Sequence, residues 1–462
     1  MELLSVRDLC KTYPGFTLDH VSFSLESGYI MGFIGRNGAG KTTTLKSMLG
    51  LVHPDGGTVE MFGMDLRENE SACRQQIGVV LGDARYYGSK RLRDVAETTA
   101  RFYEHWDDAA YREYMKRFSL DETKRVRELS TGMWVKFTLA LALSHGARLL
   151  LLDEPTSGLD PVSRDELLDI FRDTVANGER SILFSTHIIS DLEKCADLIT
   201  YIHNGKILTS TDRDTFTDAY RSFRSRGGTY RHGGHHGAHR TGGERMKNLL
   251  YKEFRLAIHP SVYIFFALAA LLLVPSYPYY VSFFYLTLGV FLTFKTNRAE
   301  NDIFYSALLP VRKGDVVRAR VLTVALLELA NILIAIPFAA ISAKINPAGG
   351  NNAGIEPNVA LFGLSFLMYG GFNLIFFPAF YKTGRSEGKS FLWGGVFTFL
   401  YIIAAESLAQ YIPSPVSAYL DTLEKSAQLR QLPVLFAGIA LWAAFTLLSA
   451  KISAERFEKV DL

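Results

Sequence analysis

The chain has 462 residues, which suggests two to four domains, and its net charge of +3 indicates no particular class of partner. Its three cysteines form no CxxC pair, which argues against a disulfide framework and against a zinc site. Residues up to about 223 mix charged and apolar positions as a soluble α/β domain does, whereas uncharged runs near bilayer-spanning length occur from residue 258 onward. Residues 1–5 carry no signal-peptide pattern, so we expect the first half to stay in the cytoplasm.

Three predicted strands precede a glycine-rich loop. Alternating runs at residues 3–9 and 18–25 predict two strands, and residues 29–34 predict a buried strand that ends at the loop. The loop reads Gly35-Arg36-Asn37-Gly38-Ala39-Gly40-Lys41-Thr42, and residues 43–49 predict a helix directly after it. This sequence is typical of a phosphate-binding loop.

The residue types of this loop explain how it would bind phosphate. Glycines let the backbone curl so that its N–H groups face phosphate oxygens, and the positive end of the following helix favours the anion. Lys41 would neutralise the β- and γ-phosphates, and Thr42 would offer its hydroxyl to Mg²⁺. A purely structural glycine turn does not explain a lysine and a threonine directly after it. We therefore predict nucleotide binding through these residues: Gly35, Asn37, Gly38, Ala39, Gly40, Lys41, Thr42 and Thr43.

An aromatic residue upstream could complete the nucleotide site. Tyr13 lies 28 residues before Lys41. Its ring could stack on a purine base, or it could pack on the core as an ordinary strand aromatic. We favour stacking because the rest of the nucleotide-binding pattern is present.

Two acidic residues follow a predicted buried strand. Residues 149–152 are four leucines, which predicts a strand buried on both faces, and Asp153 and Glu154 come directly after it. Acids in this position emerge at the carboxyl edge of a parallel sheet, where ligands bind. Asp153 would hold Mg²⁺ through water, and Glu154 would orient and deprotonate the water that attacks the γ-phosphate. A solvated acidic loop is the alternative, which the phosphate loop upstream disfavours.

A third motif, Leu129-Ser130-Thr131-Gly132-Met133, lies between these two and precedes a predicted helix at residues 134–143. Here the chain resembles the ATP-binding cassette (ABC) ATPases, whose signature at this place reads Leu-Ser-Gly-Gly-Gln. The resemblance covers residues 1 to about 210. It extends to Ser157-Gly158-Leu159-Asp160, which matches the family's D-loop, and to Thr186-His187, which matches its switch histidine.

The resemblance implies an α/β ATPase domain over residues 1–222, with ATP and Mg²⁺ as cofactors. It assigns His187 a catalytic role beside Glu154. In that family the signature residues, here Ser130 and Gly132, touch the γ-phosphate held by the other ATPase subunit, and Asp160 joins them at the nucleotide. A helix N-terminus with a hydroxyl and free N–H groups suits an anion. One chain carries one phosphate loop and one signature, so the resemblance implies a dimer with a second copy or a sister chain.

Three residues depart from the family's pattern. Thr131 and Met133 replace the glycine and glutamine of the signature, and Asp83 stands where the Q-loop glutamine is expected. Asp83 could still contact Mg²⁺ or water, but it brings negative charge toward a polyphosphate. We expect ATP hydrolysis, at a rate that these changes could slow.

A polar segment separates the two halves. Residues 223–245 have almost nothing to bury and predict a flexible basic linker. A metal-binding tract is the alternative, since the segment contains four histidines: His232, His235, His236 and His239. Met246-Lys247-Asn248-Leu249-Leu250 looks like the start of a separate polypeptide, as if an ATPase and a permease had been joined by nature or by engineering.

Residues 246–462 predict a transmembrane permease domain with about six helices. The first two spans are short and turn at a proline-rich tetrapeptide, so a re-entrant pair is an alternative. Fifteen lysines and arginines lie next to the spans on the proposed inner side, and three lie in the outer loops. This bias predicts that both ends of this half lie in the cytoplasm. The predicted spans are residues 259–275, 278–294, 321–343, 359–381, 391–412 and 432–450.

Other features of this half refine the prediction. Residues 246–257 alternate apolar and basic positions, which suits an interfacial helix. Residues 297–320 resemble the inner loop of bacterial ABC export permeases, where a short helix docks on the ATPase. Glu328 and Asn331 are costly in lipid and should face the bundle interior or water, with either a substrate-path role or a structural hydrogen bond for Glu328. For Glu406, near the outer end of its span, we expect snorkelling or a surface position rather than a functional role.

The sequence as a whole predicts a multidomain protein: an α/β P-loop ABC ATPase domain followed by an all-α transmembrane helical bundle. We expect a half-size exporter, multi-pass in the bacterial cell membrane, that dimerises with a second copy or a sister half-transporter. Its expected partners are the lipid bilayer and a small amphipathic, drug-like or lipid-like substrate, and no nucleic acid. One alternative is a signalling or resistance module that senses or dislodges a ligand without moving it. Another is a nucleotide-binding regulator that hardly turns over.

Overall fold

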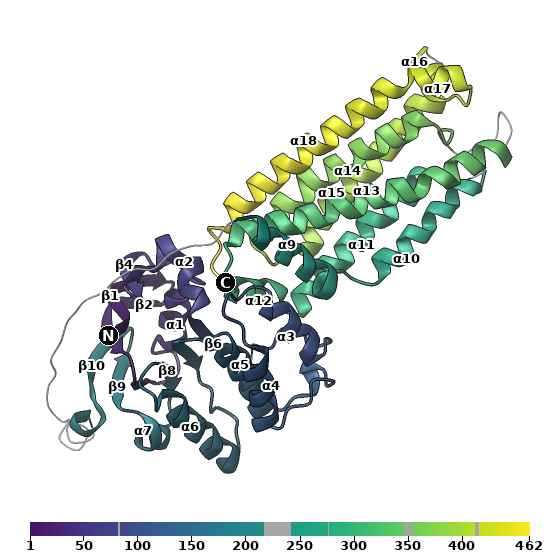
Figure 1. Ribbon diagram of the computed structural model, residues 1–462. Helices are drawn as coiled ribbons and strands as arrows, with labels where there is room; N and C mark the ends of the chain where they lie inside the picture. The colour runs from purple at the N-terminus through teal and green to yellow at the C-terminus, as the bar shows by residue number, and fades with distance from the viewer. Residues whose placement is uncertain (82–83, 217–241, 276, 346–350, 352–353, 412–414) are drawn as a thin grey trace. The chain divides into compact units, whose positions relative to one another are not determined.

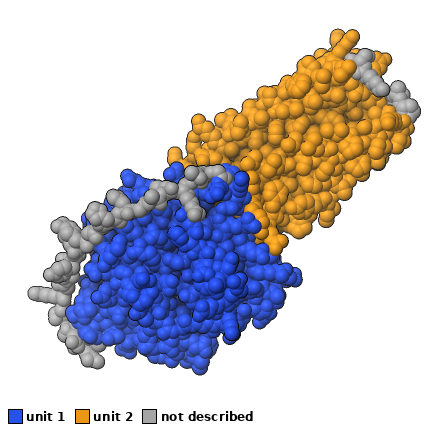
Figure 2. All heavy atoms as spheres, viewed as in Figure 1, with its two compact units in different colours: residues 1–248, 300–312, 461–462 blue, residues 249–299, 313–460 orange. Residues whose placement is uncertain are grey.

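The computed structural model describes residues 1–81, 84–216, 242–275, 277–345, 351, 354–411 and 415–462. Asp83 and the four linker histidines lie outside the described residues. The chain forms two compact units (Figure 2). The first unit comprises residues 1–248, 300–312 and 461–462, and the second comprises residues 249–299 and 313–460. Two short segments from the second half of the sequence therefore belong to the first unit.

A six-stranded sheet forms the centre of the first unit, in the order β10-β9-β3-β8-β7-β6. Its strands are parallel except β10, which is antiparallel to β9. Both faces of β3 and β7 are buried, which explains their unbroken apolar sequences. The strands are β3 (Ile30–Ile34), β6 (Ile77–Leu81), β7 (Leu149–Asp153), β8 (Ser181–Thr186), β9 (Leu198–His203) and β10 (Lys206–Asp212).

A second, antiparallel sheet has the order β2-β1-β4-β5. Its apolar residues share one hydrophobic core with β3, β7 and the helix after the glycine-rich loop. Antiparallel strands joined by short turns explain the alternating sequence near the start of the chain. The strands are β1 (Glu2–Tyr13), β2 (Phe16–Glu26), β4 (Gly56–Met61) and β5 (Met64–Asp65).

Helices complete the first unit (Figure 1). The most buried is α5, whose residues from Trp134 to Ser144 are all buried except one, so its sequence is apolar all round. The helix α12 (Asp302–Leu308) also belongs to this unit. Besides α12, the helices of this unit are α1 (Lys41–Met48), α2 (Leu66–Gln75), α3 (Leu92–Ala100), α4 (Asp108–Arg117), η1 (Val126–Glu128), α5 (Thr131–Ser144), α6 (Pro161–Val175) and α7 (Ile189–Cys195).

The second unit is helical, and α13, α14, α15 and α18 run side by side in Figure 1. Its helices include α10 (Ser261–Ala267), η3 (Leu268–Leu273), α11 (Tyr280–Ala299), α13 (Lys313–Ile345), α14 (Val359–Phe380), α15 (Glu387–Glu406), η4 (Ser407–Tyr411), α16 (Pro415–Leu420), α17 (Lys425–Arg430) and α18 (Leu432–Phe457). The helix α9 (Gly242–Lys252) and η2 (Glu253–Ala257) precede them.

A helix lies over each of the six predicted spans. Among the described residues, four helices are long and apolar enough to cross a membrane: α13, α14, α15 with part of η4, and α18. Residues 244–257 and 261–273 form a pair bent by 86°, which would make a fifth span if it were one unit. The number of six spans and the re-entrant alternative stay predictions.

Buried polar side chains join three of these helices. Glu328 on α13 is 1% exposed and accepts hydrogen bonds from Asn373 Nδ2 of α14 at 3.0 Å and from Trp442 Nε1 of α18 at 2.7 Å. The prediction that Glu328 and Asn331 face the bundle interior is confirmed, since Asn331 is also 1% exposed. The structural alternative for Glu328, a hydrogen bond to a neighbouring helix, is thus supported by two partners, Asn373 and Trp442.

The predicted surface position of Glu406 is wrong. Its side chain is 8% exposed, and its Oε2 accepts a hydrogen bond from the Ile355 N–H at 2.7 Å. A Cβ on Gly354 would lie 2.6 Å from Glu406 Oε1, so the loop before α14 covers the carboxylate. Chain folding over the helix end, which local sequence does not encode, buries this residue.

Close packing of α14 against α18 generates a stability prediction. A Cβ on Gly438 would lie 2.0 Å from the Gly363 carbonyl oxygen, so small residues let the two backbones approach. We expect Gly438→Val to force the helices apart and to destabilise the protein by about 1–3 kcal/mol, lowering the Tm in detergent by on the order of 5 °C. Gly395→Val on α15 is the control, because a Cβ there meets nothing within 4 Å. Equal effects of both changes would contradict the interpretation.

Candidate nucleotide-binding site

The glycine-rich loop connects β3 to α1 at the carboxyl edge of the parallel sheet. Gly40 has φ +112°, and a Cβ there would lie 2.7 Å from Leu18 Cδ2, so this position needs glycine. At Gly35 a Cβ would lie 2.6 Å from the Ile202 carbonyl oxygen. The predicted binding residues divide by burial: Gly35, Ala39, Gly40 and Lys41 are buried, Thr43 is half-buried, and Asn37, Gly38 and Thr42 are exposed.

Lys41 turns back over the loop that precedes it. Its side chain is 5% exposed, and Nζ donates to the Gly35 carbonyl at 2.8 Å. Nζ also forms an ion pair with Glu154 Oε1 at 3.1 Å. The ammonium group and this carboxylate therefore face each other directly above the loop.

Asp153 at the end of β7 is held by two hydroxyl groups. Thr42 Oγ1 donates to Asp153 Oδ2 at 2.8 Å, and Ser185 Oγ donates to Asp153 Oδ1 at 2.5 Å. Ser185 Oγ also accepts a hydrogen bond from the Glu154 N–H at 2.9 Å. This serine therefore orients both acidic residues, because β7 and β8 pair with Asp153 opposite Ser185.

Sequence reasoning missed Ser185. A signal was present, since Ser185 directly precedes the Thr186-His187 pair, and an apolar run, Ile182-Leu183-Phe184, comes directly before it. The carboxyl ends of parallel strands meet at one edge of a sheet, so a serine at that position was a candidate neighbour of Asp153.

Glu154 has a strained backbone conformation, and its side chain lies between Lys41 and His187. Its φ is +47°, a region that residues other than glycine seldom adopt. His187 Nδ1 lies 2.9 Å from Glu154 Oε2, while Lys41 holds Oε1. The structure therefore brings Lys41, Thr42, Asp153, Glu154 and His187 into one hydrogen-bonded cluster.

The signature residues lie apart from this cluster. Ser130 caps α5, where its Oγ accepts a hydrogen bond from the Met133 N–H at 3.2 Å. Asp160 caps α6, where its Oδ1 accepts from the N–H groups of Val162 and Ser163. In the described part of the chain, no hydrogen bond or ion pair joins Ser130, Gly132 or Asp160 to the phosphate loop.

Tyr13 ends β1 and pairs with Phe16 across a hairpin. The Phe16 ring approaches the loop, since its Cζ would lie 2.9 Å from a Cβ on Gly40. The Tyr13 ring is half-buried and has Lys11 Nζ at 5.4 Å from its centre. Burial, with the carboxylates of Asp461 and Asp55 adding to it, raises the pKa of the Tyr13 hydroxyl, so the ring stays neutral.

The Thr131 departure has a partner in the structure. Arg85 Nη2 donates to Thr131 Oγ1 at 3.4 Å, and Nη1 donates to the Leu129 carbonyl at 2.7 Å. A glycine at position 131 would lack this acceptor. The structure gives no comparable contact for the Met133 side chain.

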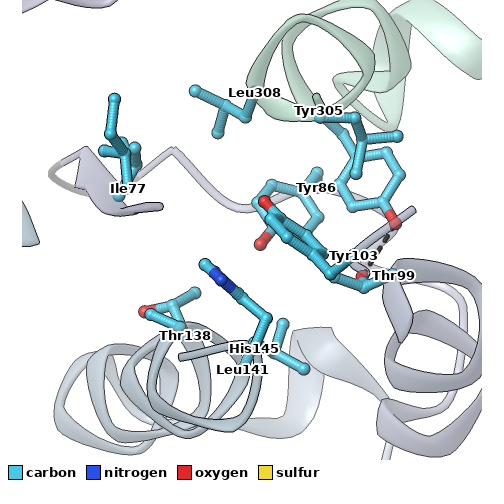
Figure 3. A pocket seen from close by; sticks show the side chains of 12 residues that line it. Ile77, Tyr86, Thr99, Tyr103, Thr138, Leu141, His145, Tyr305 and Leu308 are labelled. Carbon is cyan, nitrogen blue, oxygen red and sulfur yellow. Dashed lines mark hydrogen bonds between the residues drawn. The ribbon is translucent and has the colours of Figure 1, made fainter. Parts of the chain in front are cut away.

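A small hollow in the first unit lies beside α12, away from the phosphate loop in sequence and in its lining residues (Figure 3). Tyr305 of α12 lies 2.8 Å from Thr99 Oγ1 through its hydroxyl, and the rings of Tyr103 and His145 stack 3.7 Å apart. Burial lowers the pKa of His145 to about 3, so its ring is neutral in cells. The hollow has a volume of about 40 Å³, room for a water molecule rather than a nucleotide.

Comparisons with known proteins identify the family. The model of the ABC transporter family matches residues 18–157, and that of the ABC-2 family transporter protein matches residues 248–458. The ATP-binding protein YtrB of Bacillus subtilis (strain 168) is 32% identical over 219 residues, which are 47% of this chain and 75% of YtrB. The bacitracin transport ATP-binding protein BcrA of Bacillus licheniformis is 34% identical over 45% of this chain and 68% of BcrA.

The chain belongs to the ABC transporter family. It joins an ABC ATPase domain, which binds ATP and hydrolyses it to power transport, to a following ABC-2 permease domain. The resemblance inferred from the motifs and the predicted fold class are thus confirmed. The permease domain and the apolar helices indicate a membrane protein with a cytoplasmic ATPase domain.

The position of Ser185 generates a prediction for this ABC transporter. We expect Ser185→Ala to lower the kcat of ATP hydrolysis about tenfold with little change in KM, because it removes the contacts that orient Asp153 and Glu154. Steady-state phosphate release by the full-length protein in lipid measures both constants. Ser181→Ala is the matched control, since Ser181 lies at the other end of β8 and donates to the Glu26 carbonyl. An unchanged kcat in Ser185→Ala would contradict the assignment.

Proposed function

We propose that this ABC transporter is a half-transporter that dimerises, with a second copy or a sister chain, and exports an amphipathic, drug-like or lipid-like substrate across a bacterial cell membrane. The observation that carries the proposal is the cluster around Glu154, whose carboxylate is shared between Lys41 and His187. This cluster contains an acid with a cation and a histidine each within hydrogen-bonding distance of it, and these are groups that phosphoryl-transfer chemistry uses.

The roles of these residues follow from their contacts. ATP phosphates would compete with Glu154 for Lys41, because a polyphosphate carries more negative charge than a carboxylate. The released carboxylate would accept a proton from the attacking water, while His187 holds its other oxygen. Glu154 therefore acts as the general base only when nucleotide has taken its cation, which links base activation to ATP binding.

Thr42 and Asp153 fit a magnesium ion. A hydroxyl and a carboxylate supply the hard oxygen donors that Mg²⁺ prefers, and they already lie 2.8 Å apart in the structure. The ion would neutralise charge on the β- and γ-phosphates. Asp83 stays a predicted additional ligand that the described residues do not include.

The dimer proposal follows from the separation of the signature from the phosphate loop. Ser130 and Gly132 lie at the N-terminus of α5, where a hydroxyl and free N–H groups suit an anion. Among the described residues, no hydrogen bond or ion pair joins either of them to the cluster at Glu154. Two ATPase domains facing each other would let each signature complete the site of the other.

Coupling to the permease would pass through residues 300–312, which belong to the first unit. The Asn301 side chain donates to the Arg85 carbonyl at 2.7 Å, and the Tyr87 N–H donates to the Glu300 carbonyl at 2.8 Å. Arg85 in turn holds Leu129 of the signature motif. A movement of residues 300–312 would therefore displace Arg85 and, through it, the signature loop that is proposed to complete the partner's site.

The proposed substrate class is based on the names of relatives and on the composition of the membrane half. Relatives include the bacitracin transport ATP-binding protein BcrA, a Nod factor export ATP-binding protein of Burkholderia lata that is 36% identical, and a probable multidrug ABC transporter ATP-binding protein of Escherichia coli. These names describe those proteins, whose matches cover 40–46% of this chain. We carry over from them the direction, outward, and the chemistry, amphipathic.

Removing the general base tests hydrolysis and dimerisation together. We expect Glu154→Gln to lower kcat by on the order of 10²–10⁴-fold and to trap a dimer with bound ATP, because the water loses its proton acceptor while ATP binding persists. Phosphate release and particle mass in lipid nanodiscs measure the two effects. Glu193→Gln, an exposed carboxylate of α7, is the control. If wild type and Glu154→Gln release phosphate equally slowly, the chain is a nucleotide-binding regulator instead.

Transport into vesicles distinguishes export from signalling. We expect inside-out vesicles to accumulate bacitracin, the first probe, in an ATP-dependent manner that Glu154→Gln abolishes, because net movement requires turnover. A panel of other amphipathic peptides and lipid analogues follows the same protocol. ATPase stimulation by a ligand without its accumulation would favour a module that senses or dislodges the ligand.

A further inference from the structure

Residues 461 and 462 belong to the ATPase unit, although they follow the last membrane helix almost directly. The helix α18 ends at Phe457, and residues up to Val460 belong to the second unit. Three residues therefore separate a membrane helix from a pair of residues that pack in the ATPase unit. The established coupling of ABC ATPases to their permeases does not account for this pair.

Leu462 is fastened to the region where the helix after the phosphate loop ends. Its N–H donates to the Leu51 carbonyl at 2.9 Å, and its main-chain oxygen accepts from Lys46 Nζ of α1 at 3.1 Å. Its side chain packs against the hydrophobic core of the first unit. Because α1 begins with Lys41, Leu462 holds the far end of the helix that presents the phosphate-binding lysine.

Asp461 joins two segments that are distant in sequence. Its Oδ1 lies 2.9 Å from both the backbone nitrogen and the Nδ1 of His53, and its Oδ2 forms an ion pair with Lys11 Nζ at 3.0 Å. Lys11 also donates to the His53 carbonyl at 2.8 Å. One carboxylate therefore fixes the end of β1 against the loop after α1.

Lys11 lies between this carboxylate and the ring of Tyr13, the residue proposed to stack on adenine. Its side chain is 12% exposed, and Nζ lies 5.4 Å from the centre of the Tyr13 ring. Burial alone would lower the pKa of Lys11, but the hydrogen bond and charge of Asp461, with help from Asp55, raise it above its usual value. The Asp461 carboxyl stays ionised, because hydrogen bonds from His53 and Lys11 outweigh its burial and lower its pKa.

We propose that Asp461 and Leu462 are positioning residues of the ATP site: a clasp that holds Lys11 beside the Tyr13 ring and fixes the far end of α1. Without Asp461, the ammonium group of Lys11 loses its closest counter-charge, and only the His53 carbonyl at 2.8 Å and Asp55 at 3.5 Å still hold it beside the Tyr13 ring. The clasp links α18 covalently to the purine side of the site, a route separate from residues 300–312. The proposal rests on the proposed stacking role of Tyr13.

The test uses the full-length protein in lipid nanodiscs. We expect Asp461→Ala to raise the KM for ATP about threefold while kcat changes less than twofold, because a partly exposed ion pair contributes modestly and acts here on binding. Asp461→Glu should restore most of the affinity. Glu455→Gln is the matched control, since this exposed carboxylate of α18 has no hydrogen bond or ion pair in the described part of the chain.

A second variant approaches the same contact from the other side. We expect Lys11→Met to raise KM by a similar factor, and the double variant to raise it no further than either single one. Lys11→Met also serves if Asp461→Ala fails to fold. An unchanged KM in the folded variants, or a fall in kcat alone, would overturn the clasp and leave residues 461–462 as a structural contact.

Tyr13→Ala, measured beside them, separates the clasp from the stacking role. A raised KM in Tyr13→Ala with an unchanged KM in Asp461→Ala overturns the clasp alone. An unchanged KM in both overturns the stacking role as well. The vesicle assay for export is independent of these constants, so its failure would leave the clasp standing.

Discussion

The contacts of the Glu154 carboxylate hold the proposed ATP site together. It is held at one oxygen by Lys41, from the loop after β3, and at the other by His187, just after β8. These groups meet because β3, β8 and β7 are neighbours in one parallel sheet, so their carboxyl ends lie at the same edge. The buried leucines of β7 fix the position of that edge, and Glu154 follows β7 directly, with a positive φ.

Local sequence predicted those parts of the site whose chemistry lies in a single run. The phosphate loop, the acidic end of β7 and the family resemblance were readable because each motif is contiguous. Ser185 was missed because its role depends on the register between β7 and β8, which no short run encodes. Glu406 was placed wrongly for a similar reason, since a loop 51 residues earlier in the chain covers it. The docking of residues 461–462 had no local signal at all.

Two segments of the permease sequence belong to the ATPase unit, and they contact different parts of it. Residues 300–312 meet residues 85–87, which hold the signature loop, and the Pro310 carbonyl accepts a hydrogen bond from Ser71 at 2.7 Å. Residues 461–462 meet Lys11, His53 and the end of α1. One segment thus contacts Arg85, which holds the signature loop, whereas the other contacts Lys11 beside Tyr13 and the far end of the helix that begins with Lys41. The two segments of the permease sequence therefore contact separate parts of the ATPase unit.

The membrane bundle contains a buried carboxyl group, that of Glu328, and a close contact between two helix backbones. Burying the Glu328 carboxyl in an apolar environment is unfavourable unless hydrogen bonds compensate for the lost water. Asn373 and Trp442 supply them from two other helices, and Asn373 also donates to Thr446 at 3.1 Å. Apolar packing alone would let α14 slide along α18, because lipid-facing and helix-facing leucines are chemically alike. The polar partners, together with the Gly363–Gly438 approach, favour one register of α18 against α14 and α13 over the others.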